Sequence, residues 1–143
     1  MTKVLVVEDD RQVSSMYKNM LIMSGYDVKT AADGEEGLVI VRSWLPELIL
    51  LDVLIPKING LDVLKQLKAD KNTQKIPVVV MTNLSAIEDE EAALALGAEK
   101  YIIKSEYEPK QISGMVAEVL VNNGIWNTTE TNIINILFTG HRA

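Results

Sequence analysis

The sequence contains no cysteine, so it can form neither a disulfide framework nor a thiolate metal site. It also lacks long apolar runs, and none approaches the roughly 20 residues that a helix needs to cross a bilayer. The first ten residues, "MTKVLVVEDD", do not have the layout of a secretory signal. We therefore expect a cytoplasmic protein with no membrane-bound part.

Basic residues are scarce relative to acidic ones. The chain has 143 residues, of which 14 are Lys or Arg and 20 are Asp or Glu, and its formal net charge is −6. This balance argues against direct nucleic-acid binding through a basic surface. Hydrophobic residues make up 48% of the chain, which is typical of a globular protein, and the length suits one domain with a short extension.

Short apolar segments alternate with amphipathic stretches along the chain. The predicted strands are "KVLVV" (3–7), "YDVKTA" (26–31), "LILLD" (48–52), "IPVVVMT" (76–82) and "KYIIK" (100–104). Between them, apolar residues recur at helical spacing. In the first such stretch these are Val13, Met16, Tyr17, Met20 and Leu21. Buried strands that alternate with amphipathic helices predict an α/β fold, a doubly wound parallel sheet with helices on both faces.

Cap and turn residues predict where several helices begin and end. Gly25 is a stop signal for the first helix. Asp33, with Glu36 three residues later, predicts a capping box, and "SAIE" (85–88) predicts another. Pro109 suits the first turn of the last helix.

Polar side chains stand at the carboxyl ends of the predicted strands, which is where parallel α/β sheets place their functional sites. They are Glu8, Asp9 and Asp10 after the first strand, Asp52 at the end of the third, Thr82 at the end of the fourth, and Lys104 at the end of the fifth, with Tyr101 three residues earlier. Each alone has a purely structural explanation, such as a helix N-cap at Asp9 or Asp10. Together they predict one acidic pocket flanked by a hydroxyl and an ammonium.

The carboxylates of Glu8, Asp9 and Asp52 would repel one another, and a hard divalent cation relieves that cost. Mg²⁺ fits, because it accepts a few carboxylates and keeps several waters. A metal, a hydroxyl, an ammonium and a nucleophilic carboxylate are the parts that phosphoryl transfer requires. The sequence has neither a G-x-x-x-x-G-K-[ST] nor a G-x-G-x-x-G loop, so the phosphoryl group is expected to come from another molecule.

On these residues the sequence resembles the receiver domain of two-component response regulators, the chemotaxis-regulator-like family. The motifs that carry the resemblance are "VVEDD" (6–10), "LILLDVLIPKINGLDVL" (48–64), "IPVVVMT" (76–82) and "GAEKYIIKS" (97–105). The resemblance implies a receiver domain over residues 1–121, followed by an extension of unknown role over 122–143. It also implies a flavodoxin-like sheet of five strands in the order 2-1-3-4-5.

The resemblance further implies a role for each catalytic residue. Asp52 is the expected phosphoacceptor, and the donor is a histidine kinase or a phosphotransfer protein. Thr82 and Lys104 are expected to bind the phosphoryl group, and Thr82 with Tyr101 is expected to form a switch. The switch would change a partner-binding surface on the fourth helix, fifth strand and fifth helix. Ser105 departs from the family, which usually has proline at this position.

The metal site is also carried over from the resemblance. Glu8, Asp9 and Asp52 are expected to hold Mg²⁺, with Mn²⁺ as a possible substitute, and the backbone carbonyl of Leu54 is expected to be a further ligand.

Other interpretations lead to different proteins. A degenerate receiver that acts as a phosphorylation-independent scaffold would not need the intact set of site residues. An aspartyl-phosphate hydrolase would resemble Asp-x-Asp, whereas the second position after Asp52 is Leu54. A flavodoxin-like flavin binder would have a Ser-, Thr- and Gly-rich first loop, whereas "EDDRQ" (8–12) is acidic and would repel a phosphate. Because the remaining residues are too few for an output domain, a stand-alone signalling switch is expected.

Overall fold

The computed structural model describes residues 1–83 and 87–126, in which strands and helices alternate. The strands are β1 (Lys3–Val7), β2 (Asp27–Ala31), β3 (Leu48–Leu51), β4 (Val78–Thr82) and β5 (Lys100–Ile103). The helices are α1 (Arg11–Met23), α2 (Gly34–Trp44), α3 (Gly60–Ala69), α4 (Ile87–Ala95) and α5 (Pro109–Asn122), with a 3₁₀ helix at Lys104–Glu106 before α5. The predicted alternation of strand and helix is confirmed.

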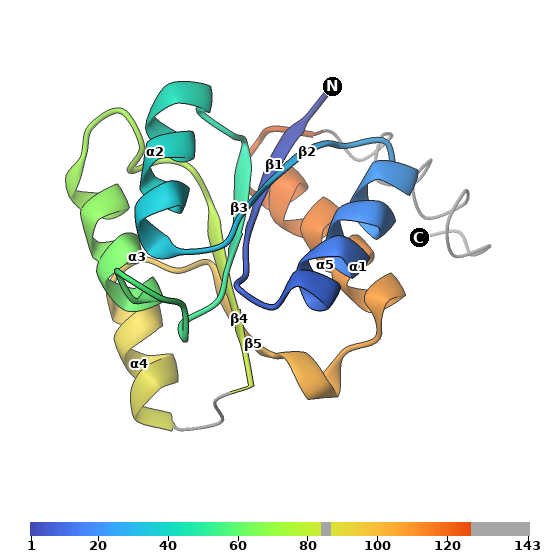
Figure 1. Cartoon of the computed structure of the whole chain (residues 1–143). Coiled ribbons are helices and arrows are strands. Elements are labelled where there is room, and N and C mark those ends of the chain that lie inside the picture. Colours follow the sequence, from blue (N-terminus) through green and yellow to red (C-terminus); the bar gives the residue numbers. More distant parts are fainter. Residues whose placement is uncertain (84–86, 127–143) are drawn as a thin grey trace.

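The strands form one parallel sheet in the order β2-β1-β3-β4-β5. Figure 1 shows α2, α3 and α4 on one face of this sheet and α1 and α5 on the other. The doubly wound, flavodoxin-like fold and the strand order expected from the sequence are therefore confirmed. In such a sheet all the strands point the same way, so their carboxyl ends share one edge.

The central strands are buried on both faces, which explains their continuous apolar sequences. One hydrophobic cluster lies on the side of α2, α3 and α4 and includes Ile49 and Leu51 of β3. The other lies on the side of α1 and α5 and includes Leu48 and Leu50 of the same strand. Alternate residues of a strand thus supply both clusters, and polar side chains are left for the ends of the strands.

Side-chain caps fix the beginnings of the first two helices. The Asp10 carboxylate caps α1 by accepting hydrogen bonds from two backbone N–H groups of its first turn. The predicted capping box of α2 is present, because Asp33 accepts from the backbone N–H of Glu36 at 2.8 Å and Glu36 accepts from that of Ala32 at 3.1 Å. Gly25 follows α1 with a φ of +92°, a conformation that favours glycine. The other predicted box, at 85–88, begins outside the described residues.

Helix α1 buries a narrower stripe than its sequence predicts. Tyr17 and Leu21 are buried, but 43% of Met16 is exposed. Met16 lies on the rim of a groove that continues to Ser105 and Tyr107 in the segment after β5. Met16, although part of the apolar helical pattern, is therefore half-exposed, because this turn of α1 borders a groove.

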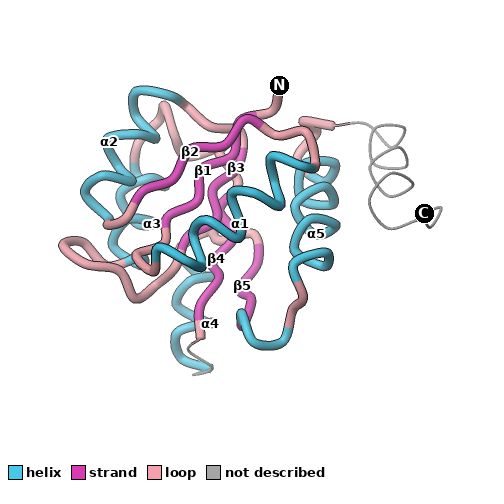
Figure 2. The backbone as a smooth tube through the Cα atoms, turned by 45° about the vertical axis from the view of Figure 1, so that its right-hand side comes forward, coloured by secondary structure: helices cyan, strands magenta, loops and turns pink. Residues whose placement is uncertain are grey.

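The chain after α5 folds back over the beginning of the sheet. Helices α1 and α5 run side by side on their face of the sheet (Figure 2). Beyond α5, the ring of Trp126 stacks on that of Tyr26, with centroids 5.3 Å apart and an angle of 10° between the planes. The Trp126 indole also donates a hydrogen bond to the hydroxyl of Thr2 at 2.9 Å. These contacts hold Trp126 against the beginning of the sheet.

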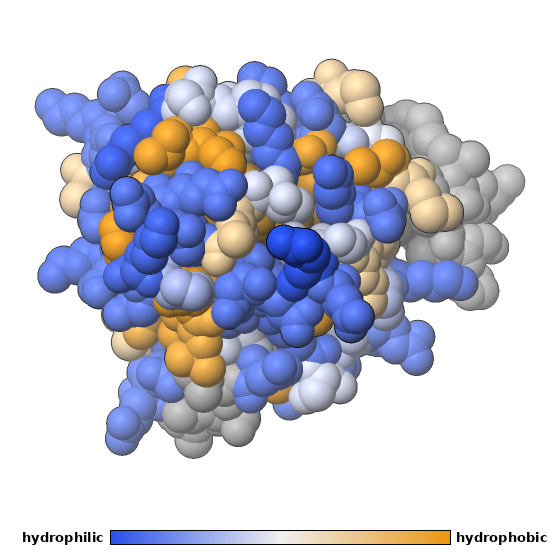
Figure 3. Space-filling view, in the orientation of Figure 1, coloured by the Kyte–Doolittle hydropathy of each residue, from blue (hydrophilic) through white to orange (hydrophobic). Residues whose placement is uncertain are grey.

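The visible surface is mostly hydrophilic, with separate hydrophobic patches (Figure 3). Several large apolar side chains are exposed, among them Val39 and Leu45. Within residues 1–83 and 87–126, no helix combines the length and the apolar character needed to cross a membrane.

Candidate metal and phosphoryl site

The predicted acidic pocket forms at the carboxyl edge of the sheet. Glu8 follows β1, and its backbone N–H donates to the carbonyl of Ala31 at 2.9 Å. Asp52 follows β3, and its backbone N–H donates to the carbonyl of Val7 at 3.1 Å. One carboxylate oxygen from each of Glu8, Asp9 and Asp52 lies within 4.8 Å of the others. The structure thus brings together the three carboxylates that the sequence analysis selected.

These carboxylates differ in their exposure to solvent. Glu8 is 4% exposed and Asp52 is 8% exposed, whereas Asp9 is an exposed residue. Asp10, the fourth acid in this part of the chain, is occupied as the cap of α1. The pocket therefore has two buried carboxylates at its base and one at its mouth.

Lys104 joins the two buried carboxylates. Its ammonium donates to Oδ2 of Asp52 at 2.7 Å and also forms a short ion pair with Oε1 of Glu8. The remaining oxygens accept backbone hydrogen bonds, Oε2 of Glu8 from Asp10 at 3.0 Å and Oδ1 of Asp52 from Leu54 at 3.1 Å. Each buried carboxylate thus has both oxygens satisfied, which is what burial of a charged group requires.

The electrostatics of the pocket reflect this pairing. Burial raises the pKa of Glu8 above its ordinary value, although hydrogen bonds from Lys104 and Asp10 partly oppose the rise. Burial also lowers the pKa of Lys104, but its hydrogen bonds to Asp52 and Glu8 outweigh that effect and leave the pKa raised. Lys104 therefore carries its positive charge throughout the neutral range.

The loop between β3 and α3 is held close to Asp52 by a glycine. A Cβ on Gly60 would lie 2.2 Å from the carbonyl oxygen of Asp52 and 2.7 Å from the Cα of Val53. Any other residue at position 60 would push the loop away from Asp52. Lys57 in this loop has a φ of +68°, and its ammonium lies 3.6 Å from the Asp33 carboxylate at the start of α2. The close approach at Gly60 and the ion pair of Lys57 thus both restrict this loop.

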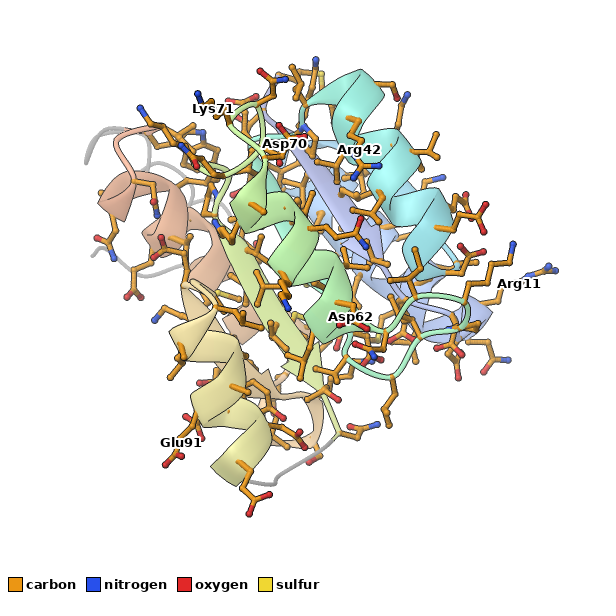
Figure 4. The ribbon with its side chains drawn as sticks, turned by 90° about the vertical axis from the view of Figure 1, so that its left-hand side faces the viewer. Arg11, Arg42, Asp62, Asp70, Lys71 and Glu91 are labelled. Atoms are coloured by element: carbon orange, nitrogen blue, oxygen red, sulfur yellow. The ribbon has the colours of Figure 1, made fainter. Side chains whose placement is uncertain are left out.

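Figure 4 looks onto α2, α3 and α4 and shows Asp62 at the start of α3, where this loop ends. The Asn59 side chain caps α3 by accepting from the backbone N–H of Asp62 at 3.0 Å. The cap sets the direction in which the chain leaves the pocket. Gly60 was not singled out in the sequence, although the pair Asn-Gly before a helical pattern was a usable turn signal.

Thr82 and Tyr101 lie on the two strands next to the acidic pocket. Thr82 is fully buried at the end of β4, opposite Ile103 of β5. Tyr101 is partly buried and packs against the hydrophobic cluster on the α4 side. Leu54, whose backbone N–H donates to the Asp52 carboxylate, is 59% exposed. Thr82 and Tyr101 thus lie on the fourth and fifth strands, as their positions in the sequence predict.

The donor set fits a hard divalent cation. All of the donors are oxygens, and one carboxylate is open to solvent, which leaves room for the waters that Mg²⁺ retains. Glu8 and Asp52 would share their charge between the cation and Lys104. The carboxylates that would hold the ion are therefore Glu8, Asp9 and Asp52.

The fold and the site together define an α/β protein with an acidic, lysine-bridged pocket at the carboxyl edge of its sheet. The model of the response regulator receiver domain family matches residues 4–117, and the chain belongs to this family. Receiver domains of two-component systems accept phosphoryl groups from histidine kinases and bind Mg²⁺ or Mn²⁺ in an acidic pocket.

Curated relatives extend beyond the region they share with this chain. The probable transcriptional regulator ycf27 of Cyanophora paradoxa is 36% identical over 136 residues, which are 94% of this chain and 55% of that protein. The alkaline phosphatase synthesis transcriptional regulatory protein PhoP of Bacillus subtilis is 37% identical over 118 residues, which are 82% of this chain and 48% of that protein. The chain thus spans about half the length of the curated relatives it matches.

Solved structures show the same fold. A CheY-like receiver domain protein from Methanospirillum hungatei JF-1 has a TM-score of 0.80 at 27% identity, and the match covers 87% of this chain and 97% of that one. The Mn²⁺-bound form of response regulator Rcp1 has a TM-score of 0.72 at 28% identity, with coverage of 85% and 93%. The second of these is a metal-bound structure of a similar protein.

Proposed function

We propose that this chain is a phosphorylation-dependent switch in which Asp52 accepts a phosphoryl group from a histidine kinase or phosphotransfer protein. The observation that carries the proposal is the position of the Asp52 carboxylate. It is buried between the Lys104 ammonium and the backbone N–H of Leu54, at the base of the acidic cluster. This carboxylate has an ammonium beside it that can neutralise charge on an incoming phosphoryl group.

The transfer step follows from this geometry. A carboxylate oxygen of Asp52 attacks the phosphorus, and the bond from phosphorus to the imidazole nitrogen of the donor breaks. The electron pair of that bond stays on the nitrogen, and the product is an acyl phosphate on Asp52. A bound Mg²⁺ supplies charge neutralisation to the phosphoryl oxygens. Lys104 also neutralises charge on the phosphoryl oxygens, once its ammonium moves from Glu8 toward the new phosphoryl group.

The proposed switch includes Thr82 and Tyr101. The Thr82 hydroxyl would bond the phosphoryl group, and Tyr101 would follow it inward, shifting an equilibrium between two arrangements of the chain after β4. The partner surface would then be α4, β5 and α5. The first turn of α4 is acidic, with Glu88, Asp89 and Glu90, which together with the net charge of −6 favours a protein partner over nucleic acid.

The proposal assigns the receiver domain to residues 1–121 and leaves 122–143 as an extension outside the switch. The curated relatives are named as transcriptional regulators, and one, from Synechocystis sp. (strain ATCC 27184 / PCC 6803 / Kazusa), is named as DNA-binding. DNA binding is a property of that relative. For this chain we propose that the signal passes on through contact with another protein.

Substitution of Asp9 tests the metal site. Because Asp9 is the exposed carboxylate of the cluster, Asp9→Asn should weaken Mg²⁺ binding on the order of tenfold or more, since the charge of the ligand set controls affinity. The rate of phosphorylation should fall as Mg²⁺ binding weakens. Without metal, Asp9→Asn should unfold at a slightly higher temperature than the unsubstituted protein, because the repulsion between Asp9 and the other two carboxylates is removed. Calorimetric titration with Mg²⁺ measures the affinity, and Asp10→Asn is the matched control. Equal Mg²⁺ affinity in Asp9→Asn and the unsubstituted protein would remove Asp9 from the metal site.

The switch is tested by amide NMR with beryllofluoride, a stable analogue of the phosphoryl group. In the presence of Mg²⁺, we expect shifts to spread from Thr82 to Ser105 and into α5. Shifts confined to the loop after Asp52 would mean that binding is not propagated. The Asp52→Asn variant should show no shifts in this range, which separates binding at the acceptor from effects of the reagent.

A further inference from the structure

Tyr17 occupies an unexpected place behind the acidic pocket. It lies in the second turn of α1, is 5% exposed, and packs in the hydrophobic cluster that also contains Val6, Leu50 and Met81. Its spacing along α1 predicts only an inward-facing core residue.

Tyr17 borders the acidic pocket. Tyr17 lines a cavity of about 10 Å³ whose other side chains with a charged or hydroxyl group are Glu8, Asp52 and Lys104. The charges that act on the phenol come from those same three residues. The ring therefore forms the back wall of the pocket in which the proposed acceptor stands.

Tyr17 also lines the open groove of about 260 Å³ between α1 and the segment after β5. Tyr17 and Lys104 are the two residues that border both the small cavity and this groove. They therefore stand between the buried carboxylates and this groove. Without the ring, the flexible lysine side chain would have room to turn toward the groove, away from Asp52.

We infer that Tyr17 is a positioning residue for Lys104. Its ring confines the Lys104 ammonium to the space over the Glu8 and Asp52 carboxylates. The inference rests on the proposed function, because it assigns Lys104 to the phosphoryl transfer that Asp52 undergoes. Tyr17 itself touches no reacting atom and acts through the lysine. Its ring has this effect by occupying space, so the hydroxyl is the less important part.

Mg²⁺ binding distinguishes the positioning of Lys104 by Tyr17 from a purely structural role of the ring. The ammonium competes with a divalent cation for the carboxylate of Glu8. Releasing Lys104 should therefore leave Mg²⁺ affinity unchanged or higher, while phosphoryl transfer becomes slower. Damage to the pocket would instead disperse the carboxylates and weaken both Mg²⁺ binding and transfer.

The experiment compares Tyr17→Leu and Tyr17→Phe in the full chain, with acetyl phosphate as the donor and saturating Mg²⁺. Tyr17→Leu should slow phosphorylation by roughly tenfold, since a displacement of about 1 Å costs this much or more, and should bind Mg²⁺ at least as tightly as the unsubstituted protein. Tyr17→Phe keeps the ring and should stay within about twofold in rate. Leu21→Ala is the control for core damage, because Leu21 is fully buried in the same cluster but lines neither space.

A double-substitution cycle identifies the residue through which Tyr17 acts. In a Lys104→Gln background, Tyr17→Leu should change the rate by less than about twofold, because the group it positions is gone. A fall in phosphorylation rate of the same size in both backgrounds would overturn the inference. Two results for Tyr17→Leu alone would also overturn it: a rate equal to that of the unsubstituted protein, or a loss of Mg²⁺ affinity that matches the loss of rate.

A second readout keeps the two proposals apart. The Nζ resonance of Lys104, assigned by its absence in Lys104→Gln, should be protected from hydrogen exchange in the unsubstituted protein and lose that protection in Tyr17→Leu. If the unsubstituted protein takes up no phosphoryl group, the proposed function fails, and this resonance still tests the positioning. Equal protection in both proteins would refute the role of Tyr17.

Discussion

Asp52→Asn should abolish the phosphoryl adduct altogether. The asparagine amide retains a carbonyl oxygen that can accept from the Lys104 ammonium, so the pocket keeps its shape, but it has no carboxylate to attack phosphorus. The unsubstituted protein, incubated with acetyl phosphate and Mg²⁺, should carry an adduct that is stable in acid and labile in base. Intact mass before and after alkaline treatment measures it.

The control for this variant is Asp10→Asn. Asp10 lies two residues from Glu8 but caps α1 and is turned away from the acceptor role, and asparagine caps helices about as well as aspartate. This variant should be labelled to the same extent as the unsubstituted protein. Full labelling of Asp52→Asn would show that another residue is the acceptor, and cleavage of the labelled protein would then locate it.

Lys104→Gln should have two large effects. Phosphorylation should slow by roughly 10²- to 10³-fold, because the variant loses the protein's own charge stabilisation of the phosphoryl oxygens. The free energy of unfolding at neutral pH should also fall by about 2–4 kcal/mol, because Glu8 and Asp52 remain buried without their shared cation. Chemical denaturation without metal gives the stability, and the initial rate of labelling gives the transfer.

The pH dependence of this stability loss follows from the two pKa shifts. The raised pKa of Lys104 means that its contribution is fully present below the value of an unfolded lysine, 10.5, and is lost as the pH rises through the folded value. On the acid side, the raised pKa of Glu8 means that it takes up a proton above its unfolded value of 4.5, which removes the ion pair with Lys104. The stability difference between Lys104→Gln and the unsubstituted protein should therefore be largest between these limits. A difference that is constant from pH 4 to pH 11 would contradict the ion-pair explanation.

The sequence was sufficient to predict the fold and the polar residues at the strand ends. Five apolar segments with helical stretches between them allow few arrangements, and the strand order followed from the resemblance carried by the Asp52 and Lys104 motifs. The meeting of Glu8, Asp9 and Asp52 was predictable because parallel strands share a carboxyl edge. What sequence spacing left open was which acid caps α1, and the structure assigns the cap to Asp10.

The residues that were missed act through close packing, which has no period in the sequence. Gly60 is required because a Cβ there would collide with the backbone of Asp52. Tyr17 has the spacing of a core residue, and its position beside the pocket depends on how α1 lies on the sheet. Met16 fits the same apolar pattern but faces a groove.

The most direct test of the account is the intact mass of the unsubstituted protein after incubation with acetyl phosphate, in parallel samples with Mg²⁺ and with a chelator. Borohydride reduction of the Mg²⁺ sample, which converts an acyl phosphate to an alcohol, should then place the modification at Asp52 by peptide mapping. We predict one phosphoryl group per chain with Mg²⁺, none with the chelator, and reduction at Asp52 alone. No adduct in the presence of Mg²⁺, or an adduct of equal extent without the metal, would contradict the assignment of this chain as a metal-dependent phosphoacceptor.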